Sequence, residues 1–361
     1  MIKSFDEVFE DVTKLGVKIK TDEYHPIGKY QIIDQGQEAV AGYSDLEDGV
    51  FENVPAIVFG DHTRIVKYVD QPFFLGADGV KVLRSRFKDA NYRYLYYALK
   101  SVKIPNTGYN RHFKWLKEAK IYYPNSEEQS KIVSILNGIS SVIEHRQQEL
   151  QKLDELVKAR FVELFGDGNH PHIALIDLII EGAGLSYGIV QPGDDGTGDM
   201  GVLRPVDMVD GKISTASIKY IDRSIGDGFK KTELYGDELL ITVRGTTGIT
   251  ALTDIRFNGM NVTRGIAVVR YDRNKINPVY LNAYLNTDES QRYIQEHTKG
   301  ATLQQINLSD LRVQQIMVPP LALQEQMAAF IEQTDKSKVV VQKALDEAQT
   351  LFDSLMQEYF G

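Results

Sequence analysis

The sequence predicts an α+β protein with two globular units, each followed by a long helix, and the two helices paired as an antiparallel intramolecular coiled coil. Two observations lead there. The chain repeats itself, because an offset of 195 residues maps Leu116–Gly166 onto Leu311–Gly361, and each repeat ends in a long helical pattern with one apolar seam. An offset this large exceeds the roughly 20–50 residues of a solenoid repeat. It therefore indicates duplication of a whole module.

The first globular unit covers residues 1–124. Phe5–Leu15 has a helical pattern, Val54–Phe59 and Gly79–Leu83 are rich in strand-forming residues, and Tyr92–Leu99 reads as a short aromatic helix. We interpret the four tyrosines of this helix as core and interface residues rather than a base-stacking platform: Tyr92, Tyr94, Tyr96 and Tyr97.

The first long helix covers residues 125–166. Its seam alternates spacings of four and three, as in a coiled coil, and Gly166 follows its last apolar residue, where glycine commonly ends a helix. About 38 residues at ~1.5 Å per residue give a rod of roughly 57 Å. The seam positions are Ile132, Leu136, Ile139, Ile143, Arg146, Leu150, Leu153, Val157, Arg160 and Leu164.

The second unit, residues 167–318, repeats the order of elements. Ala174–Glu181 reads as helix, Glu238–Val243 and Gly265–Arg270 as strands, and Val279–Leu285 as the matching short helix. Up to that helix the offset is 185–186 residues, so the second unit has a longer insertion near Thr287–Gly300. Each unit is therefore predicted to have a mostly β core.

The second long helix covers residues 319–361. A helix with a single apolar stripe needs a partner, and each helix offers that partner to the other; packing of each helix only on its own unit is the alternative. Arg146 and Arg160 interrupt the first seam, and Thr334 and Lys338 the second. These polar residues either set the register or face solvent or a partner protein. The second seam comprises Met327, Ile331, Thr334, Lys338, Val341, Leu345, Ala348, Phe352, Leu355 and Tyr359.

The composition is that of an ordinary globular protein, with 42% hydrophobic and 25% charged residues. No apolar run reaches the ~18 residues of a membrane span, and the acidic N-terminal segment does not resemble a signal peptide. The absence of cysteine excludes disulfides, thiol catalysis and thiolate metal sites. We expect a cytoplasmic protein.

The net charge of −9 is unusual for a protein that binds nucleic acid, but its distribution is uneven. The two helical stretches together hold −6 of it, so the globular units are closer to neutral. A local basic face on each unit remains open, whereas overall electrostatic attraction to DNA is not expected.

Polar loops rich in Asn, Gln, Thr, Arg and Tyr recur beside glycines in both units. Asn and Gln pair with adenine, Arg pairs with guanine, and Thr and Tyr contact phosphates, so these loops are candidates to bind DNA. Each alone is more typical of a solvated turn, but their recurrence at matching places strengthens the interpretation as binding loops. The candidates in the first unit are His62, Thr63, Arg64, Asn106, Tyr109, Asn110, Arg111 and His112. Those in the second are Tyr187, Gln191, Arg244, Thr246, Thr247, Asn261, Thr263, Arg264, Thr302, Gln304, Gln305 and Asn307.

No catalytic motif accompanies these loops. The sequence has no phosphate-binding loop of the Gly-x-x-x-x-Gly-Lys-Ser/Thr type, and the glycine-rich Gly193–Gly198 is acidic, which would repel phosphate. His170 and His172 form the one close histidine pair, and a linker is the better interpretation than a metal site. We therefore predict no catalytic residues and no metal site.

These features resemble the specificity subunits of type I restriction–modification systems, along essentially the whole chain. Each motif is short, but their doubled order with long helices between is specific. They are SYGIVQPG (Ser186–Gly193), VLRPVDMVDG (Val202–Gly211), ITVRGTTG (Ile241–Gly248), GATLQQINLSDLR (Gly300–Arg312), PPLALQEQ (Pro319–Gln326), NSEEQSKIVSIL (Asn125–Leu136) and the closing LFG and YFG (Leu164–Gly166, Tyr359–Gly361).

The resemblance implies two target-recognition domains, 1–124 and 167–318, that each read one half of an asymmetric, bipartite DNA site. The conserved helices, 125–166 and 319–361, would act as a ruler over the spacer and dock two methyltransferase subunits. The chain itself would hold no cofactor and no catalytic site, and its host would be a bacterium or archaeon. The methyltransferase subunits would bind S-adenosylmethionine, and motor–nuclease restriction subunits, if present, would use ATP and Mg.

Two departures from the family pattern stand out. The double proline that opens the second helix is Tyr123-Pro124 at the first, and the loops of the two units differ in residue type, which implies two different half-sites. Two other classes of function remain. The rod and both units could form a protein-interaction scaffold, or the chain could be an enzyme, such as a nuclease, with an unrecognised site.

Overall fold

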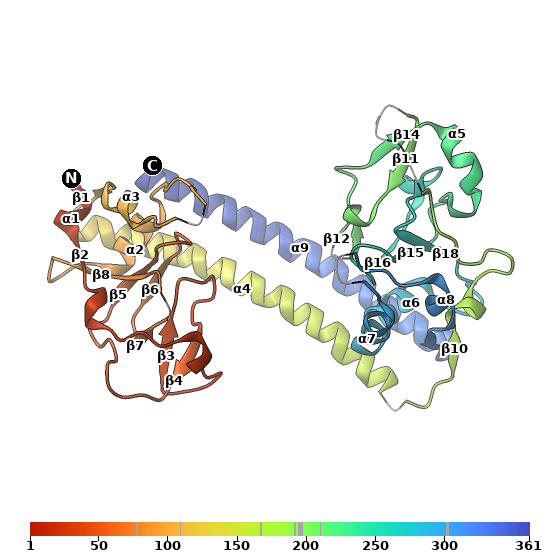
Figure 1. Cartoon of the computed structure of the whole chain (residues 1–361), viewed down its shortest axis with the longest axis horizontal. Helices are drawn as coiled ribbons and strands as arrows, with labels where there is room; N and C mark the ends of the chain where they lie inside the picture. Colours follow the sequence, from red (N-terminus) through yellow and green to blue (C-terminus); the bar gives the residue numbers. More distant parts are fainter. Residues whose placement is uncertain are drawn as a thin grey trace. The chain divides into compact units, whose positions relative to one another are not determined.

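The computed structural model describes residues 1–76, 78–108, 110–166, 168–190, 193, 198–209, 211–300 and 303–361. The chain divides into two compact units, of which the first is discontinuous in sequence. Unit 1 comprises Met1–Glu149 and Val341–Gly361, and unit 2 comprises Leu150–Val340 (Figure 1). Both termini therefore belong to unit 1.

Unit 1 is built on two small sheets. The first has the strand order β2-β8-β5-β6, with β5 (Ala56–Gly60) antiparallel to both β6 (Val66–Val69) and β8 (Val80–Ser85). The second has the order β4-β3-β7, in which β3 (Tyr30–Ile33) runs parallel to β7 (Phe73–Leu75). The remaining elements are β1 (Ile2–Ser4), α1 (Phe5–Val8), β2 (Phe9–Asp11), η1 (Thr13–Leu15), η2 (Thr21–Glu23), β4 (Gly42–Ser44), α2 (Tyr92–Lys100), α3 (Phe113–Lys117) and β9 (Lys120–Tyr122).

Among the described residues, unit 2 repeats this arrangement except for β2, which has no counterpart strand. β15 (Leu239–Thr242) lies between antiparallel β16 (Thr250–Leu252) and β18 (Ile266–Val269), and β11 (Met200–Leu203) runs parallel to β17 (Asn261–Val262) as β3 does to β7. The other elements are β10 (His172–Ala174), η3 (Leu175–Leu178), η4 (Pro205–Asp207), β12 (Met208–Val209), β13 (Lys212–Ile213), β14 (Lys219–Ile221), α5 (Arg223–Gly226), η5 (Asp227–Thr232), η6 (Ile255–Phe257), α6 (Pro278–Leu285), α7 (Asp288–His297), α8 (Leu308–Val313) and β19 (Gln315–Met317). The duplication thus includes the topology.

Each unit joins its first strand to the strand that precedes a long helix. β1 pairs antiparallel with β9 in unit 1, and β10 pairs antiparallel with β19 in unit 2. His172 lies in β10 opposite Met317, so the segment interpreted as a linker is part of this two-stranded sheet. The hydroxyl of a buried tyrosine is hydrogen-bonded to each of these two-stranded sheets. The Tyr94 hydroxyl donates to the Tyr122 carbonyl at 2.7 Å, and the Tyr280 hydroxyl donates to the Met317 carbonyl at 2.9 Å.

The long helices are α4 (Ser126–Phe165) and α9 (Leu321–Phe360), each 40 residues long. In unit 1, Ile132 and Leu136 near the start of α4 share a core with Phe352 near the end of α9. In unit 2, Phe165 at the end of α4 shares a core with Met327 near the start of α9. The helices therefore pair antiparallel, and every predicted seam position is buried or half-buried, which confirms the predicted fold class.

Two of the polar seam residues in unit 2 contact the opposite helix. Lys338 forms an ion pair with Asp154 at 2.6 Å, and the Arg160 guanidinium lies 5.9 Å from the centre of the Phe330 ring. Thr334 is buried and donates to the Phe330 carbonyl of its own helix. These contacts are consistent with a role in setting register.

Two predicted helices are mostly wrong. In Phe5–Leu15 the α-helix covers only Phe5–Val8, because Phe9 is fully buried where β2 pairs with the edge of the main sheet. In Ala174–Glu181 there is only the short turn η3, because Ile179 forms a β-bridge with Tyr271 and the Ile180 amide donates to the Arg270 carbonyl. In both places tertiary strand pairing overrides the local helical pattern.

The remaining elements follow the sequence pattern. Tyr92, Tyr94 and Tyr97 are buried in the core of unit 1, which confirms that the tyrosine cluster is structural. The insertion expected near Thr287–Gly300 contains α7. Among the described residues, none of the helices has the length and apolar character needed to cross a membrane.

Candidate nucleic-acid interface

In unit 1 the two candidate loops are joined by Asp61, the residue after β5. Its carbonyl accepts from the His112 amide at 2.7 Å, and its carboxylate accepts from the Phe113 amide at 2.7 Å. The Asp61 side chain is buried, with 4% exposure. Residues 60–64 and 106–112 are 40 or more positions apart in sequence, yet they form one surface.

Further contacts hold the same surface together. His62 Nδ1 lies 3.2 Å from the Asn110 carbonyl, and the Thr63 hydroxyl donates to the Gln35 carbonyl at 2.6 Å. Arg64 adopts a left-handed backbone with φ of 66°, which costs energy for a residue other than glycine, and its guanidinium reaches the Ile104 carbonyl. The loop after β5 is therefore held by Gln35 on one side and by residues 104–112 on the other.

The candidates in unit 1 differ in exposure. Thr63, Asn106, Asn110 and Arg111 are exposed, and His62 and Arg64 are half-buried. His112 is fully buried with its ring nitrogen 3.0 Å from the Asp61 carbonyl, so it supports the loop and offers no group to a ligand. Tyr109 lies outside the described residues.

The loops of unit 2 also converge. Gly245 donates to the Gln304 carbonyl at 2.9 Å, Arg244 forms a β-bridge with Gln305, and Ile306 donates to the Val243 carbonyl. The turn after β15 is thereby joined to the loop before α8. The Thr247 and Thr298 hydroxyls, 3.0 Å apart, add a side-chain link between these segments.

A third loop of unit 2 joins the second sheet. Ile189 donates to the Val262 carbonyl at 2.8 Å, and Arg264 donates back to the Ile189 carbonyl at 2.9 Å. Gly188 permits this approach, since a Cβ there would lie 2.0 Å from the Val262 carbonyl oxygen. Residues 187–190 and 261–264 are therefore side by side.

Exposure again separates ligand-facing residues from structural ones. Tyr187, Thr246 and Gln304 are exposed, and Arg244, Thr247, Thr263, Arg264, Gln305 and Asn307 are half-buried. Asn261 is buried, where it accepts from the Thr232 hydroxyl and donates to the Phe229 carbonyl. Asn307 is the residue before α8, and its side-chain amide donates a hydrogen bond to the Asp310 carboxylate. Gln191 and Thr302 lie outside the described residues.

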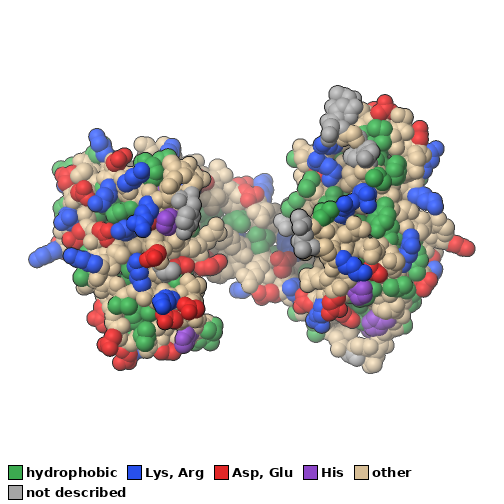
Figure 2. All heavy atoms as spheres, viewed as in Figure 1, with side chains coloured by type: hydrophobic (Ala, Val, Ile, Leu, Met, Phe, Trp, Pro, Cys, Tyr) green, Lys and Arg blue, Asp and Glu red, His purple; other side chains and the backbone are tan. Residues whose placement is uncertain are grey.

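Few of the charged side chains near these loops form ion pairs within the described residues. Lys18 forms an ion pair with Asp78 at 2.7 Å, and its hydrogen bond, with a further contribution from Arg111, lowers the pKa of the Asp78 carboxyl. Lys and Arg side chains gather on the upper part of the unit 1 face in Figure 2. Within the described ranges, no group of three or more His, Asp or Glu side chains is arranged to hold a metal ion.

Sequence reasoning missed the residues that organise these surfaces. Gln35, Asp61 and Gly188 hold the loops, and Lys114 and Trp115 line a cavity beside the loop of unit 1. The strongest available signal for that cavity was Trp115, the single tryptophan of the chain, in a basic segment.

Two copies of one α+β module, each with polar loops gathered on its surface, define a duplicated recognition protein. A family model described as type I restriction modification DNA specificity domain matches residues 1–155 and 199–348. The chain belongs to the family of type I restriction–modification DNA specificity proteins.

Individual proteins are also similar to this chain. The chain is 25% identical over 180 residues to the type I restriction enzyme EcoBI specificity subunit of Escherichia coli, a match that covers 49% of this chain and 38% of that protein. The match thus spans less than half the length of that relative. The fold is similar to the crystal structure of the type I restriction–modification system S subunit from M. genitalium, with a TM-score of 0.62, 17% identity and coverage of 100% of this chain and 96% of the other.

Proposed function

We propose that this chain is the DNA-specificity subunit of a type I restriction–modification complex. Each unit reads one half of a bipartite DNA site through its gathered loops. The observation that carries the proposal is that loops far apart in sequence are hydrogen-bonded into one polar surface in each of two units with the same topology. The target is asymmetric, because the exposed residues differ: Asn106, Asn110 and Arg111 in unit 1, and Tyr187, Thr246 and Gln304 in unit 2.

The partners and chemistry follow from this role. The chain is non-catalytic, and two methyltransferase subunits dock on the long helices and supply S-adenosylmethionine. Motor–nuclease restriction subunits, where they are present, bring ATP and Mg. The net charge of −9 favours an arrangement in which these partners supply much of the grip on phosphate. The complex acts in the cytoplasm, where its DNA substrate is found.

The test is methylation-resolved long-read sequencing of DNA from cells that carry this gene with its neighbouring methyltransferase genes. We expect methyladenine in one asymmetric, two-part motif, and we expect it to vanish when this gene alone is deleted. A strain in which the methyltransferase is present but catalytically inactive is the control. If the same motif is methylated to the same extent after this gene is deleted, the proposal is wrong.

The alternative is a scaffold that binds only proteins, which the acidic helices would suit. It is distinguished by the affinity of the assembled complex for duplex DNA as a function of salt. Phosphate contacts release counterions, so a DNA-reading complex loses affinity steeply as salt rises, whereas a scaffold shows no specific binding at any salt concentration.

A further inference from the structure

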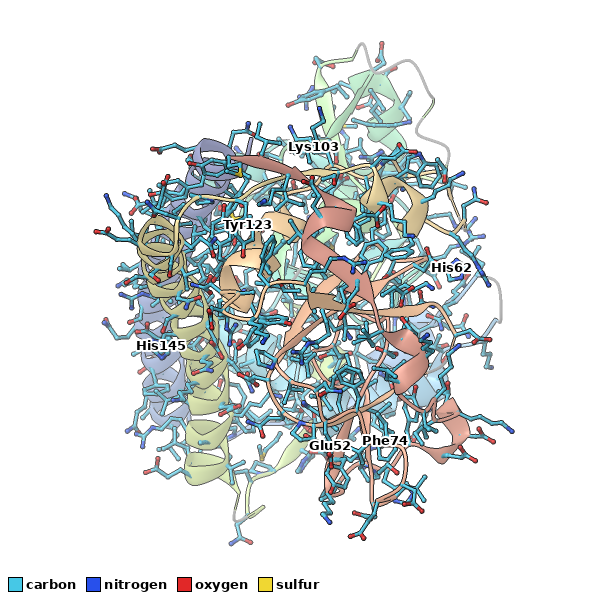
Figure 3. The ribbon with its side chains drawn as sticks, turned by 90° about the vertical axis from the view of Figure 1, so that its left-hand side faces the viewer. Glu52, His62, Phe74, Lys103, Tyr123 and His145 are labelled. Carbon is cyan, nitrogen blue, oxygen red and sulfur yellow. The ribbon has the colours of Figure 1, made fainter. Side chains whose placement is uncertain are left out.

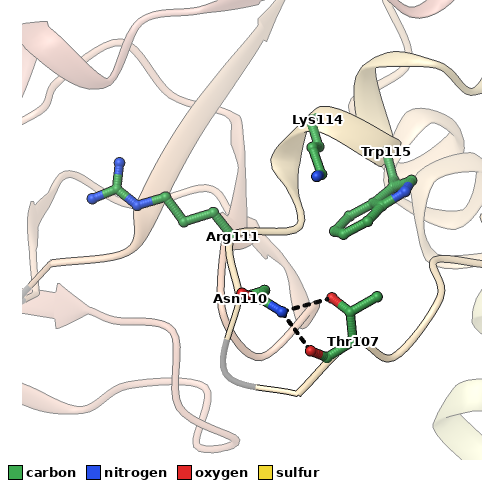
Figure 4. Close-up of a pocket in the computed structure, with 5 residues that line it drawn as sticks. All are labelled: Thr107, Asn110, Arg111, Lys114 and Trp115. Atoms are coloured by element: carbon green, nitrogen blue, oxygen red, sulfur yellow. Dashed lines mark hydrogen bonds between the residues drawn. The ribbon is translucent and has the colours of Figure 1, made fainter.

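A cavity of about 560 Å³ opens beside the candidate loop of unit 1. It is lined by Thr107, Asn110, Arg111, Lys114 and Trp115 (Figure 4). The residues come from the loop before α3 and from α3 itself, so the cavity belongs to the surface that Asp61 holds in place. Arg111 extends away from Lys114 and Trp115 in Figure 4, so these two side chains are the candidate ligand contacts.

Lys114 and Trp115 form a preformed pair. The Lys114 ammonium lies 4.1 Å from the centre of the Trp115 ring, and Lys114 is exposed while Trp115 is half-buried. The indole is also backed by the buried His112 ring, with 5.3 Å between ring centres. Among the residues that the structure describes, Lys114 forms no ion pair with a carboxylate. Its charge is therefore oriented and available to an anion.

The local charge differs from that of the matching segment in unit 2. Residues 101–124 contain five Lys or Arg and one Glu, whereas the matching residues 296–319 contain two basic and two acidic side chains. At the offset of 195 residues, Lys114 and Trp115 correspond to Ser309 and Asp310. Unit 2 therefore has neither the cation nor the aromatic ring at this position.

The cavity suits a backbone better than a base edge. Pairing with adenine requires both the oxygen and the nitrogen of an Asn amide, but Asn110 Nδ2 already donates to the carbonyl and hydroxyl oxygens of Thr107. An oriented ammonium beside an apolar ring matches a ligand with an anionic oxygen next to an apolar face. In duplex DNA that combination is the phosphate and its deoxyribose.

We propose that the cavity binds the sugar–phosphate backbone of duplex DNA next to the half-site read by unit 1, an inference that rests on the proposed function. Lys114 pairs with a phosphate, and the Trp115 indole packs against the adjacent deoxyribose. The contact adds affinity and fixes the position of unit 1 on the duplex, but it carries no sequence information. Because unit 2 lacks the Lys–Trp pair, only unit 1 makes this backbone contact.

The first test compares Lys114→Gln with Lys103→Gln in the assembled complex. Both changes remove one positive charge from unit 1, but Lys103 lines a different cavity, against the end of α9, and lies away from His62 in Figure 3. We expect Lys114→Gln to weaken duplex binding roughly three- to tenfold at about 0.1 M salt and to reduce the salt slope by about 1, with the ratio of site to non-site binding unchanged. If Lys114→Gln matches Lys103→Gln, or alters base preference, the assignment is overturned.

The second test uses Trp115 as a probe, since it is the single tryptophan of the chain. The full chain is labelled with 5-fluorotryptophan and assembled with unlabelled partners, so that one ¹⁹F resonance reports on this cavity. We expect the resonance to shift when cognate duplex is added. An unchanged resonance at saturating duplex rules out contact with Trp115. A larger shift with a single-stranded oligonucleotide would indicate base stacking and would overturn the backbone assignment.

The two proposals fail in different ways. If the wild-type complex shows no site-specific binding, the proposed function fails. If the wild-type complex binds its site but Lys114→Gln has the affinity and salt slope of the Lys103→Gln control, only the cavity has been misassigned.

Discussion

Asp61 is the residue on which the candidate interface of unit 1 depends most. Asp61→Ala removes the carboxylate that accepts a hydrogen bond from the Phe113 amide, and it therefore loosens the loop before α3, although Asp61 itself is buried. We expect the methylated motif to become degenerate in one half-site and to stay unchanged in the other. Asp61→Asn keeps an oxygen acceptor and should retain the wild-type motif. Degeneracy in both halves would contradict this role.

Arginines at matched surfaces should read single positions of the site. Arg111 is exposed in unit 1, and Arg244 is half-buried in unit 2 with its backbone fixed by the bridge to Gln305. Each change to Ala should lose ~1–3 kcal/mol of binding and relax one position, in different half-sites. Competition binding with singly substituted duplexes measures this. If both variants keep the wild-type affinity and site preference, neither residue is a base reader.

Asp207 makes the stability of unit 2 sensitive to acid. Burial raises the pKa of its carboxyl, but hydrogen bonds from Arg204 and Ser217 outweigh this and leave the pKa below its usual value. A lowered pKa in the folded state means that the stabilisation is present above the unfolded pKa of about 4 and is lost as pH falls through the folded value. Urea unfolding between pH 7 and 3 should show this loss.

The matching variant is Asp207→Asn. It should cost about 2–3 kcal/mol at pH 7, because it weakens a buried pair whose Arg204 partner keeps some contact with solvent. Its stability should also fall less between pH 5 and 3 than that of the wild type. An equal fall in both proteins would show that other carboxylates dominate the acid transition.

At the scale of elements, a buried glutamine fixes the start of each long helix. Gln324 donates to the Pro319 carbonyl at 2.7 Å and accepts from the Asn277 amide at 2.8 Å, and Gln129 donates to the Pro124 carbonyl at 2.9 Å. The same glutamine-to-proline hydrogen bond thus forms where the helix is preceded by one proline, in unit 1, and where it is preceded by two, in unit 2. The departure at Tyr123-Pro124 leaves this geometry intact.

We expect Gln324→Ala to destabilise the chain by about 2–4 kcal/mol, since it leaves the buried Pro319 carbonyl and the half-buried Asn277 amide without partners. Gln129→Ala leaves one such group and should cost about 1–3 kcal/mol. Exposed Gln326→Ala is the control and should change the free energy of unfolding little. Equal effects of the Gln324 and Gln326 variants in urea unfolding would refute the capping role.

At the scale of the whole molecule, α4 and α9 each contribute residues to both units. Seven residues inserted between Glu149 and Leu150, together with seven between Val340 and Val341, keep the heptad seam and add ~10 Å of helix. At ~3.4 Å of rise per base pair, the spacer of the methylated motif should grow by about three base pairs with both half-sites unchanged. Sequencing of methylated DNA reads this directly.

The control for this prediction is an insertion in α4 alone. It makes α4 seven residues longer than α9, so the two apolar seams can no longer pair along their whole length. We expect the chain to lose stability and the complex to methylate no defined motif. If the double insertion yields a stable complex with the original spacer, the helices do not determine the spacer length.

The sequence by itself determined the duplication, the two long helices with their seams, and the main strands, because these depend on periodic patterns many residues long. It also placed polar loops at matching points in both units. These signals are local or repeated, so they survive without knowledge of which segments meet.

Tertiary structure decided the rest, because pairing between distant segments is not encoded in local periodicity. The buried Phe9 became a strand rather than a helix since a sheet edge was there to pair with it. His112 and Asn261 looked like ligand contacts by residue type, yet both are buried supports. The loop that carries Lys114 and Trp115 to the candidate interface is anchored by Asp61, through hydrogen bonds across more than 50 residues of sequence.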